Sequence, residues 1–336
     1  MAVNDSNALS MAQYAVLSNN PMVQAVTFSL LDMGSAMTDI PFRTKKTLIA
    51  NGVRWEGNLP SVNWGAINST PVTTLGTPKP YQEQAYIMRN AIKVDKVYVE
   101  DENQIADPRA TQLAAYLRGV TYDFNDKFIN NDHASGDINS IVGLRARIDN
   151  GSQYGVWSSC KIDAGGVDLS KATMTAATAN SFLEFLEQLL WSVDSPNGEN
   201  VTLYMNEVMK RRFATALRTL GTSGGFAIVR DQFDRTVEQF MGATIKDIGY
   251  KADQATRIIT NTETNTGAAG SSTFTSIYAV HYAEDHFSGW QYEPVNAHDL
   301  GLLNDGVTYS TVVDWAGGLM SANIRSIGRL YDIKMS

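Results

Sequence analysis

The longest regular pattern of apolar positions lies between residues 107 and 131. Five apolar residues recur there at intervals of three or four, which places them on one face of an α-helix: Leu113, Leu117, Val120, Phe124 and Phe128. Asp107 can cap the first turn, and Pro108 suits the first helical position. The pattern predicts one helix over 107–131, about 35 Å long at ~1.5 Å per residue, with these five residues facing the core. Taken alone, this helix also suits an ordinary soluble enzyme.

The segments before this helix predict an arm and an extended excursion. Two short amphipathic stretches, 9–17 and 23–31, are each too short to be stable alone and need a partner surface. Residues 44–77 are rich in Gly, Asn, Ser and Thr, and Asn51-Gly52 predicts a hairpin turn. This excursion carries Trp55 and Trp64, and exposed aromatic residues on such a segment indicate a protein partner. The alternative is that both indoles fold back onto their own domain.

The rest of the chain predicts mixed helices and strands. Alternation in 93–100 predicts a half-buried strand that leads into the long helix. Asn180 or Ser181 can cap a helix over 182–193, and Asn206 can cap another that ends at Gly221. Further strands are expected at Val201 and over 243–248, 257–260, 276–281 and 289–292, followed by a pair of long strands, 307–315 and 322–333, around Ala316-Gly317-Gly318.

Composition narrows the classes of protein. The chain has 336 residues, of which 43% are hydrophobic, so it can bury a large core. A single cysteine, Cys160, excludes an intrachain disulfide. The sequence has no apolar run of about 18 residues and no signal-peptide pattern, so we expect a soluble, non-exported protein without a membrane partner. The net charge of −8, without a Lys/Arg cluster, argues against direct nucleic-acid recognition, although an acidic protein can line a compartment filled with nucleic acid.

No catalytic constellation is convincing. Residues 221–225 match G-x-S-x-G with Ser223 as the nucleophile, but that motif needs a strand before the serine, and here a helix precedes it. An intracellular serine hydrolase that uses Ser223 and one of the four histidines is therefore the alternative function. His281 and His286 lie five residues apart, which does not align them on a helix face for metal binding. We expect no enzyme activity, no cofactor and no metal.

Several short motifs, in this order, carry a family resemblance that covers nearly the whole chain. They are Gly57-Asn58-Leu59-Pro60-Ser61-Val62-Asn63-Trp64, Tyr122-Asp123-Phe124, Phe128-Ile129-Asn130-Asn131-Asp132, Ile141-Val142-Gly143-Leu144, Leu203-Tyr204-Met205-Asn206, Asn304-Asp305-Gly306-Val307-Thr308-Tyr309, Asp314-Trp315 and Ile327-Gly328-Arg329-Leu330-Tyr331. In these segments the chain resembles the major capsid (head) proteins of tailed bacteriophages.

The resemblance implies an α+β chain with the Hong Kong-type major capsid fold. The implied division is an N-terminal arm (1–42), an extended loop (43–78), a peripheral domain (79–150) that contains the spine helix 107–131, an axial domain (151–300) and returning C-terminal strands (301–336). The extended loop of such proteins reaches over a neighbouring subunit. On this basis Trp55, Trp64, Leu59 and Pro60 are the candidate contacts between subunits.

The implied function is structural. Such a protein self-assembles as hexamers and pentamers, through a procapsid, into an icosahedral head shell that encloses double-stranded DNA without reading its sequence. The implied partners are other copies of the chain, a separate scaffolding protein and a portal protein, with a decoration protein as an optional further partner. The implied location is the virion, after assembly in the cytoplasm of a host bacterium. A third possibility, a decoration or tail component, fits less well, because those proteins are commonly smaller and mainly β.

Overall fold

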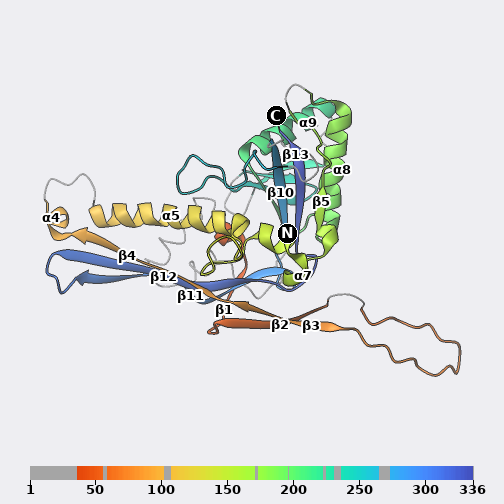
Figure 1. Ribbon diagram of the computed structural model, residues 1–336, viewed down its shortest axis with the longest axis horizontal. Coiled ribbons are helices and arrows are strands. Elements are labelled where there is room, and N and C mark those ends of the chain that lie inside the picture. The colour runs from red at the N-terminus through yellow and green to blue at the C-terminus, as the bar shows by residue number, and fades with distance from the viewer. Residues whose placement is uncertain are drawn as a thin grey trace.

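The computed structural model contains two β-sheets joined at one end of a long helix. It describes residues 36–55, 59–101, 107–170, 173–195, 197–221, 225–230, 236–264 and 273–335. A four-stranded sheet runs beside helix α5, and a seven-stranded sheet with helices α8 and α9 stands at the end of that layer (Figure 1). A separate two-stranded ribbon, β2–β3, continues into a thin loop that projects away from both sheets (Figure 1).

Helix α5 (Pro108–Asn130) is the spine of the molecule. The side chain of Asp107 accepts a hydrogen bond from the Arg109 N–H at 2.9 Å and so begins the helix, as predicted. Four of the five residues predicted to face the core are buried: Leu117, Val120, Phe124 and Phe128. The fifth, Leu113, is half-buried and packs against the same core. The Phe124 ring meets Trp315 edge-on, and the Phe128 ring meets Tyr204 and Phe287 edge-on. The helix therefore joins the cores of both sheets.

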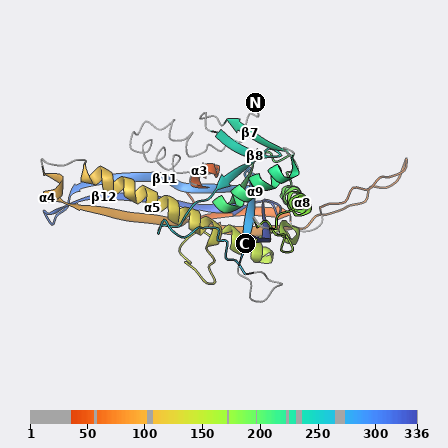
Figure 2. The ribbon, with the colours of Figure 1, turned by 90° about the horizontal axis from the view of Figure 1, so that it is seen from above.

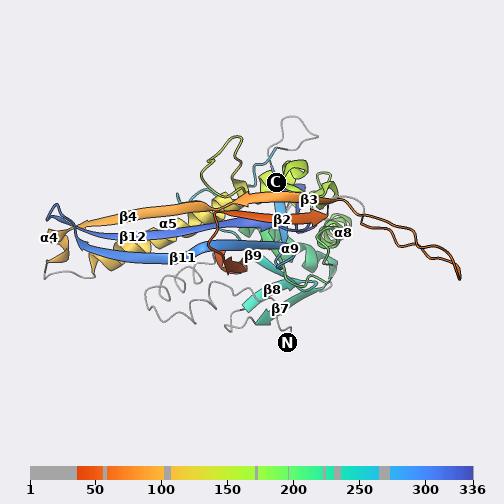
Figure 3. The same ribbon diagram turned by 90° about the horizontal axis from the view of Figure 1, so that it is seen from below.

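The four-stranded sheet has the order β1 (Phe42–Thr44), β11 (Phe287–Leu302), β12 (Thr308–Ser321), β4 (Tyr86–Asp95). Seen from above, α5 lies along one face of this sheet (Figure 2). From below, β4, β12 and β11 run side by side with α5 behind them (Figure 3). The prediction that Gly317-Gly318 separates two paired strands is wrong, because both glycines lie inside β12. A side chain at Gly318 would collide with the Trp290 indole, so glycine allows that ring to lie against the strand.

The seven-stranded sheet has the order β5 (Lys161–Asp163), β13 (Ile327–Lys334), β10 (Phe274–His281), β6 (Val201–Met205), β9 (Ala243–Asp247), β8 (Thr236–Phe240), β7 (Phe226–Arg230). Helices α8 (Ala176–Ser192) and α9 (Glu207–Leu220) pack on it through a core that includes Phe182, Leu186 and Phe213. The strand predicted over 322–333 begins only at Ile327 and pairs with β10 and β5 instead of β12.

Local start and stop signals were predicted with mixed success. Helix α9 has Asn206 as its cap and ends at Gly221, which has a φ of 64°, as predicted. Helix α8 starts earlier than predicted, because Thr175 and Thr178 form a capping box. The end of the strand predicted over 93–100 is wrong: β4 stops at Asp95, whose side chain caps a short helix, α4 (Lys96–Val99). Residues 257–260 form only an isolated bridge, not a strand.

The segment before β1 ties the two sheets together. Short helix α3 (Ala36–Asp39) begins with the Ala36 N–H donating to the Asn125 side chain of α5 at 2.9 Å. At its other end Asp39 accepts from the Tyr204 hydroxyl at 2.9 Å and pairs with Lys246. The predicted amphipathic stretches 9–17 and 23–31 lie outside the described residues. No helix in the described parts combines the length and apolar character needed to cross a bilayer.

Candidate assembly surface

The ribbon that carries the extended loop consists of β2 (Ile49–Trp55) and β3 (Pro78–Gln84), paired antiparallel. The predicted hairpin turn at Asn51-Gly52 is wrong, because these residues lie within β2 opposite Gln82 and Tyr81. A side chain at Gly52 would overlap the Tyr81 ring. Gly52 therefore makes room for the Tyr81 ring and does not form a turn.

The chain reverses direction far from the ribbon. The Ser69 N–H donates to the Ala66 carbonyl at 3.0 Å, and Asn68 between them has a φ of 67°, a conformation that asparagine tolerates. Nearer the ribbon, the Thr74 hydroxyl donates to the Ser61 carbonyl at 2.7 Å and holds the two arms together. We call residues 59–77 the distal loop; it projects well beyond β2 and β3 (Figure 3).

The distal loop exposes an unusual amount of apolar side-chain surface. Trp64 is 96% exposed, Ile67 95% and Leu75 89%. Leu59, Pro60 and Val62 are also exposed, so Leu59 and Pro60 share this surface with Trp64. Trp55, at the end of β2, is 47% exposed and lies close to Gly76. Scattered exposed apolar residues are normal, but a continuous set on one projecting segment marks an interaction site.

The distal loop also lacks charge. No Asp, Glu, Lys, Arg or His occurs between Leu59 and Pro78. Prolines at 60, 71 and 78 remove backbone donors, which hinders uncontrolled strand pairing along these arms. The surface therefore offers apolar contact without the ion pairs that fix most rim contacts.

A buried ion pair anchors the ribbon to the body of the molecule. Glu83 of β3 accepts two hydrogen bonds from the Arg147 guanidinium, at 2.6 Å and 3.1 Å. Arg147 belongs to α6 (Leu144–Asp149), and its side chain is 2% exposed. It also donates to the carbonyls of Val142 at 3.2 Å and Leu319 at 3.3 Å. Burial lowers the pKa of Arg147, but the negative charge of Glu83 and its hydrogen bonds outweigh burial, so the pKa is raised.

A second arginine fixes the other strand of the ribbon. Arg54 of β2 is buried and donates to the Tyr154 carbonyl at 2.8 Å, while its guanidinium lies 5.3 Å from the centre of the Tyr81 ring. A side chain at Gly155 would collide with this guanidinium. Sequence analysis missed both arginines. A single basic residue in a sequence does not show which distant acidic group or carbonyl it contacts, so neither partner could be identified.

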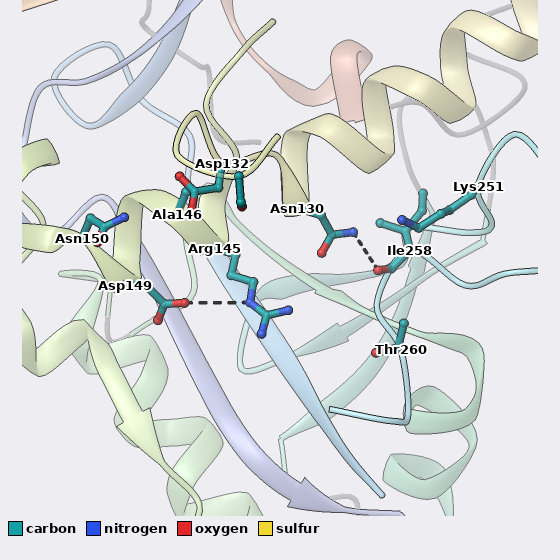
Figure 4. Close-up of a pocket in the computed structure, with 10 residues that line it drawn as sticks. Asn130, Asp132, Arg145, Ala146, Asp149, Asn150, Lys251, Ile258 and Thr260 are labelled. Atoms are coloured by element: carbon teal, nitrogen blue, oxygen red, sulfur yellow. Dashed lines mark hydrogen bonds and ion pairs between the residues drawn. The ribbon is translucent and has the colours of Figure 1, made fainter. Parts of the chain in front are cut away.

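A cavity of about 490 Å³ lies between the end of α5 and α6 (Figure 4). Its lining charges neutralise one another: Arg145 lies 3.8 Å from Asp149, and Lys251 lies 3.1 Å from Asp126 just outside the lining. The Asn130 side chain donates to the Ile258 carbonyl at 2.9 Å and closes one wall. The lining has no nucleophile beside a base and little apolar surface, so its chemistry favours neither catalysis nor tight ligand binding.

The remaining candidate chemistry is equally sparse. Ser223 lies outside the described residues. Within the described residues no cluster of three or more His, Cys, Asp or Glu side chains could hold a metal ion. His133 donates to the Ser140 carbonyl at 2.7 Å, and exposed His298 contacts Asn296 at 3.1 Å. These histidines make local polar contacts that require no catalytic role.

A spine helix along a long-stranded sheet, a second sheet with two helices, and a projecting loop ribbon together define the fold. This is the Hong Kong-type major capsid fold of tailed phages, and the predicted α+β fold class is confirmed. No protein-family model matches the sequence, and a search of curated proteins found no match.

Solved structures share this fold along most of the chain. The capsid of a native GTA particle matches with a TM-score of 0.57 and 10% identity over 90% of each chain. The structure described as Mycobacterium phage Bobi matches with a TM-score of 0.52 and 11% identity, over 90% of this chain and 89% of that one. The holo-SrpI encapsulin complex from Synechococcus elongatus PCC 7942 matches with a TM-score of 0.55 and 13% identity, over 97% and 96%. Because the sequence identities are this low, the structural matches show a common fold and no more.

Proposed function

We propose that this chain is the major capsid protein of a tailed phage and forms the shell of its head. The observation that carries the proposal is the distal loop, which presents exposed Trp64, Ile67 and Leu75 on a rigidly anchored ribbon. A monomer gains nothing from exposing this surface. A second copy that covered the loop would bury it, and the Hong Kong-type fold supports a shell as the assembly.

The proposed parts follow the two sheets. The peripheral domain would comprise α5 with the four-stranded sheet, and the axial domain would comprise the seven-stranded sheet with α8 and α9. Residues 1–42 would form the N-terminal arm and 43–78 the extended loop. β11 belongs to the four-stranded sheet, so the proposed boundary after the axial domain moves from residue 300 to about the start of β11 at Phe287.

The proposed mechanism is assembly through many modest contacts. Each subunit inserts its own distal loop and receives another, so the energy of one weak contact is multiplied by closed symmetry. Hexamers and pentamers of the same chain would close an icosahedral shell around double-stranded DNA. The net charge of −8 is compatible with an inner wall that does not hold DNA tightly.

The partners that belong to this proposal are a separate scaffolding protein and a portal protein, with a decoration protein as an optional third. The mature location would be the virion, after assembly in the host bacterial cytoplasm. The proposed protein is structural and uses no cofactor.

A second candidate is a shell that is not a phage head. The encapsulin match covers 97% of this chain and 96% of its own. Both candidates require the distal loop to mediate contact between copies, so they differ in the contents and not in the assembly. The nucleic acid inside purified particles separates them: packaged genomic DNA supports the phage head, and particles free of DNA in phage-producing cells contradict it.

Electron microscopy and sedimentation of the full chain, with and without the products of neighbouring genes, test the shell proposal. Closed shells, or rings of five and six that convert to shells, are expected. Trp64→Ala should reduce their yield, whereas Trp191→Ala, at a Trp 64% exposed on α8, serves as a control for loss of any surface indole. A chain that remains monomeric or dimeric in every mixture contradicts the proposal.

A further inference from the structure

The polypeptide passes twice between the two sheets at one place. β10 connects to β11 through residues 282–286, and β12 connects to β13 through residues 322–326. We call these two connections, with His281 at the end of β10 and the C-terminal end of α8, the crossing. His281 and His286 lie in it with ring centres 4.0 Å apart and planes inclined by 32°.

Hydrogen-bond partners lie at both ring nitrogens of His286. Its Nδ1 lies 3.0 Å from a carboxylate oxygen of Asp285 and therefore carries the hydrogen. Its Nε2 lies 3.3 Å from the Asn323 amide nitrogen. The Asn323 oxygen already accepts from the Arg325 N–H at 3.1 Å, so its amide group faces His286 as a donor.

The His281 ring is held by a hydrogen bond to the main chain of α8. Val193, which caps α8, accepts from Nδ1 of His281 through its carbonyl at 3.1 Å. Burial lowers the pKa of His281, and the adjacent His286 ring lowers it further. The structure therefore stacks His281 against His286 at a separation where two imidazolium ions would repel each other.

Both acidic and basic side chains surround the crossing, so their charges partly cancel. Asp194 lies 4.0 Å from Nε2 of His286 and 3.8 Å from Arg325, and exposed Asp285 adjoins the same ring. Glu284 pairs with Arg43. The two nearby aspartates can accommodate one positive charge on the histidine pair, but the second would have no further carboxylate of its own.

The thiol of Cys160 also faces the crossing and does not titrate in the acid range. It contacts the carbonyls of Ser192 at 3.3 Å and Ile324 at 3.9 Å. Burial raises the pKa of this thiol to about 11, so it remains neutral.

Main-chain hydrogen bonds join the two connections beside the stacked rings. The His281 N–H donates to Ser326 at 2.9 Å, and the Ala322 N–H donates to the His286 carbonyl at 2.8 Å. The Tyr282 N–H donates to Asn200 at 2.8 Å. Separation of the rings would strain the first two bonds, which join the two connections to each other.

We propose that the stacked His281–His286 pair is an acid-sensitive latch that keeps the crossing closed while His281 is neutral and loosens it when His281 takes up a proton. The device needs only the single chain and does not rest on the proposed assembly. Its effect is local: the link between the sheets opens, while the aromatic core around Phe128 remains.

The direction of the pH effect on opening follows from the lowered pKa of His281. An open crossing lets the ring regain its ordinary pKa of 6.5, so acidification below that value favours the open form. Each proton taken up on opening changes the opening equilibrium by up to about tenfold per pH unit. Above pH 6.5 the closed form is fully favoured.

Hydrogen exchange of the full chain, followed by mass spectrometry at about pH 7.5 and about pH 5.5 and corrected for intrinsic rates, tests the latch. Up to about tenfold loss of protection is expected at the lower pH in peptides that cover 278–290 and 320–328. Peptides from α5 should change little. His281→Gln, which keeps a donor for Val193, should remove the pH dependence. The control His298→Gln, at an exposed histidine, should retain it.

Two results would overturn the latch. One is equal protection of the crossing at both pH values in the parent chain, and the other is an undiminished pH response in His281→Gln. If that variant does not fold, His286→Asn takes its place with the same expectation. NMR of the four histidine rings in the parent supplies a readout without mutation: titration of His281 at or above the ordinary histidine pKa also contradicts the latch.

Discussion

The anchor of the loop ribbon can be tested by removal of one charge. In Glu83→Gln the side chain keeps its shape and one accepting oxygen, but it no longer neutralises Arg147. That guanidinium is 2% exposed, so water cannot replace the lost partner. Its bonds to the carbonyls of Val142 and Leu319 remain. The variant therefore isolates the charge of Glu83 from the rest of the Arg147 contacts.

The expected cost follows from the burial of the pair. Removal of one partner from a buried ion pair destabilises a protein by about 3–5 kcal/mol. We expect about 3 kcal/mol, because glutamine still accepts one of the two hydrogen bonds, which are 2.6 Å and 3.1 Å long in the parent. For a chain of this size the midpoint of thermal unfolding should fall by roughly 4 °C.

Chemical denaturation of the unassembled chain, followed by fluorescence, measures this difference. Arg147→Met and the double variant complete a cycle, and a coupling energy of about 2 kcal/mol or more is expected. Asp314→Asn is the matched control, because its partner Arg89 is largely exposed and lies 3.4 Å away. That change should cost less than about 1 kcal/mol. A cost for Glu83→Gln no larger than for the control would refute the anchoring argument.

Three further changes probe other parts of the structure. Trp64→Ala should leave the unfolding free energy of the single chain within about 0.5 kcal/mol, which denaturation of the unassembled chain measures. It should raise the threshold concentration for assembly by roughly 30-fold if the indole contributes ~2 kcal/mol to a contact, which light scattering against concentration measures. Phe128→Ala should cost about 3–5 kcal/mol in denaturant unfolding, because its ring is fully buried between the two sheets, and a loss under 1 kcal/mol would contradict that role. Cys160 should resist a thiol reagent near pH 8 in the native chain and react fully in denaturant, because burial raises its pKa to about 11; rapid native labelling would contradict this.

Elements governed by neighbouring residues could be predicted from the sequence. Helix α5 has a cap, a proline at its first position and a sustained apolar face, all within one segment. Helix α9 is similarly defined by Asn206 and Gly221. In both cases the side chain that satisfies the helix end lies next to that end. The order of the segments then carried the family resemblance, although no single motif did so.

Elements governed by distant residues could not be predicted. Gly52 and Gly318 were interpreted as turn residues, whereas each makes room in a strand for an aromatic ring far away in the sequence, Tyr81 and Trp290. A sequence pattern shows that glycine is present but not which ring approaches it.

The candidate surface was predicted in part. The sequence predicted an extended segment that carries Trp55 and Trp64, and the structure exposes Trp64 on the distal loop and about half of Trp55 at the end of β2. The turn at Ala66–Ser69 and the anchors Arg54 and Arg147 could not be identified. Both arginines find their partners only after the ribbon folds onto α6 and α7 (Gly151–Tyr154).

The uncharged distal loop has a thermodynamic consequence for any assembly that it holds together. Contacts made by Trp64, Ile67 and Leu75 gain their free energy from removal of apolar surface from water, and this gain weakens on cooling. Dilution of salt should leave the same contacts nearly unchanged, because the loop contributes no ion pair to be screened. Particles that depend on the loop should therefore tolerate changes in ionic strength and come apart more readily in the cold.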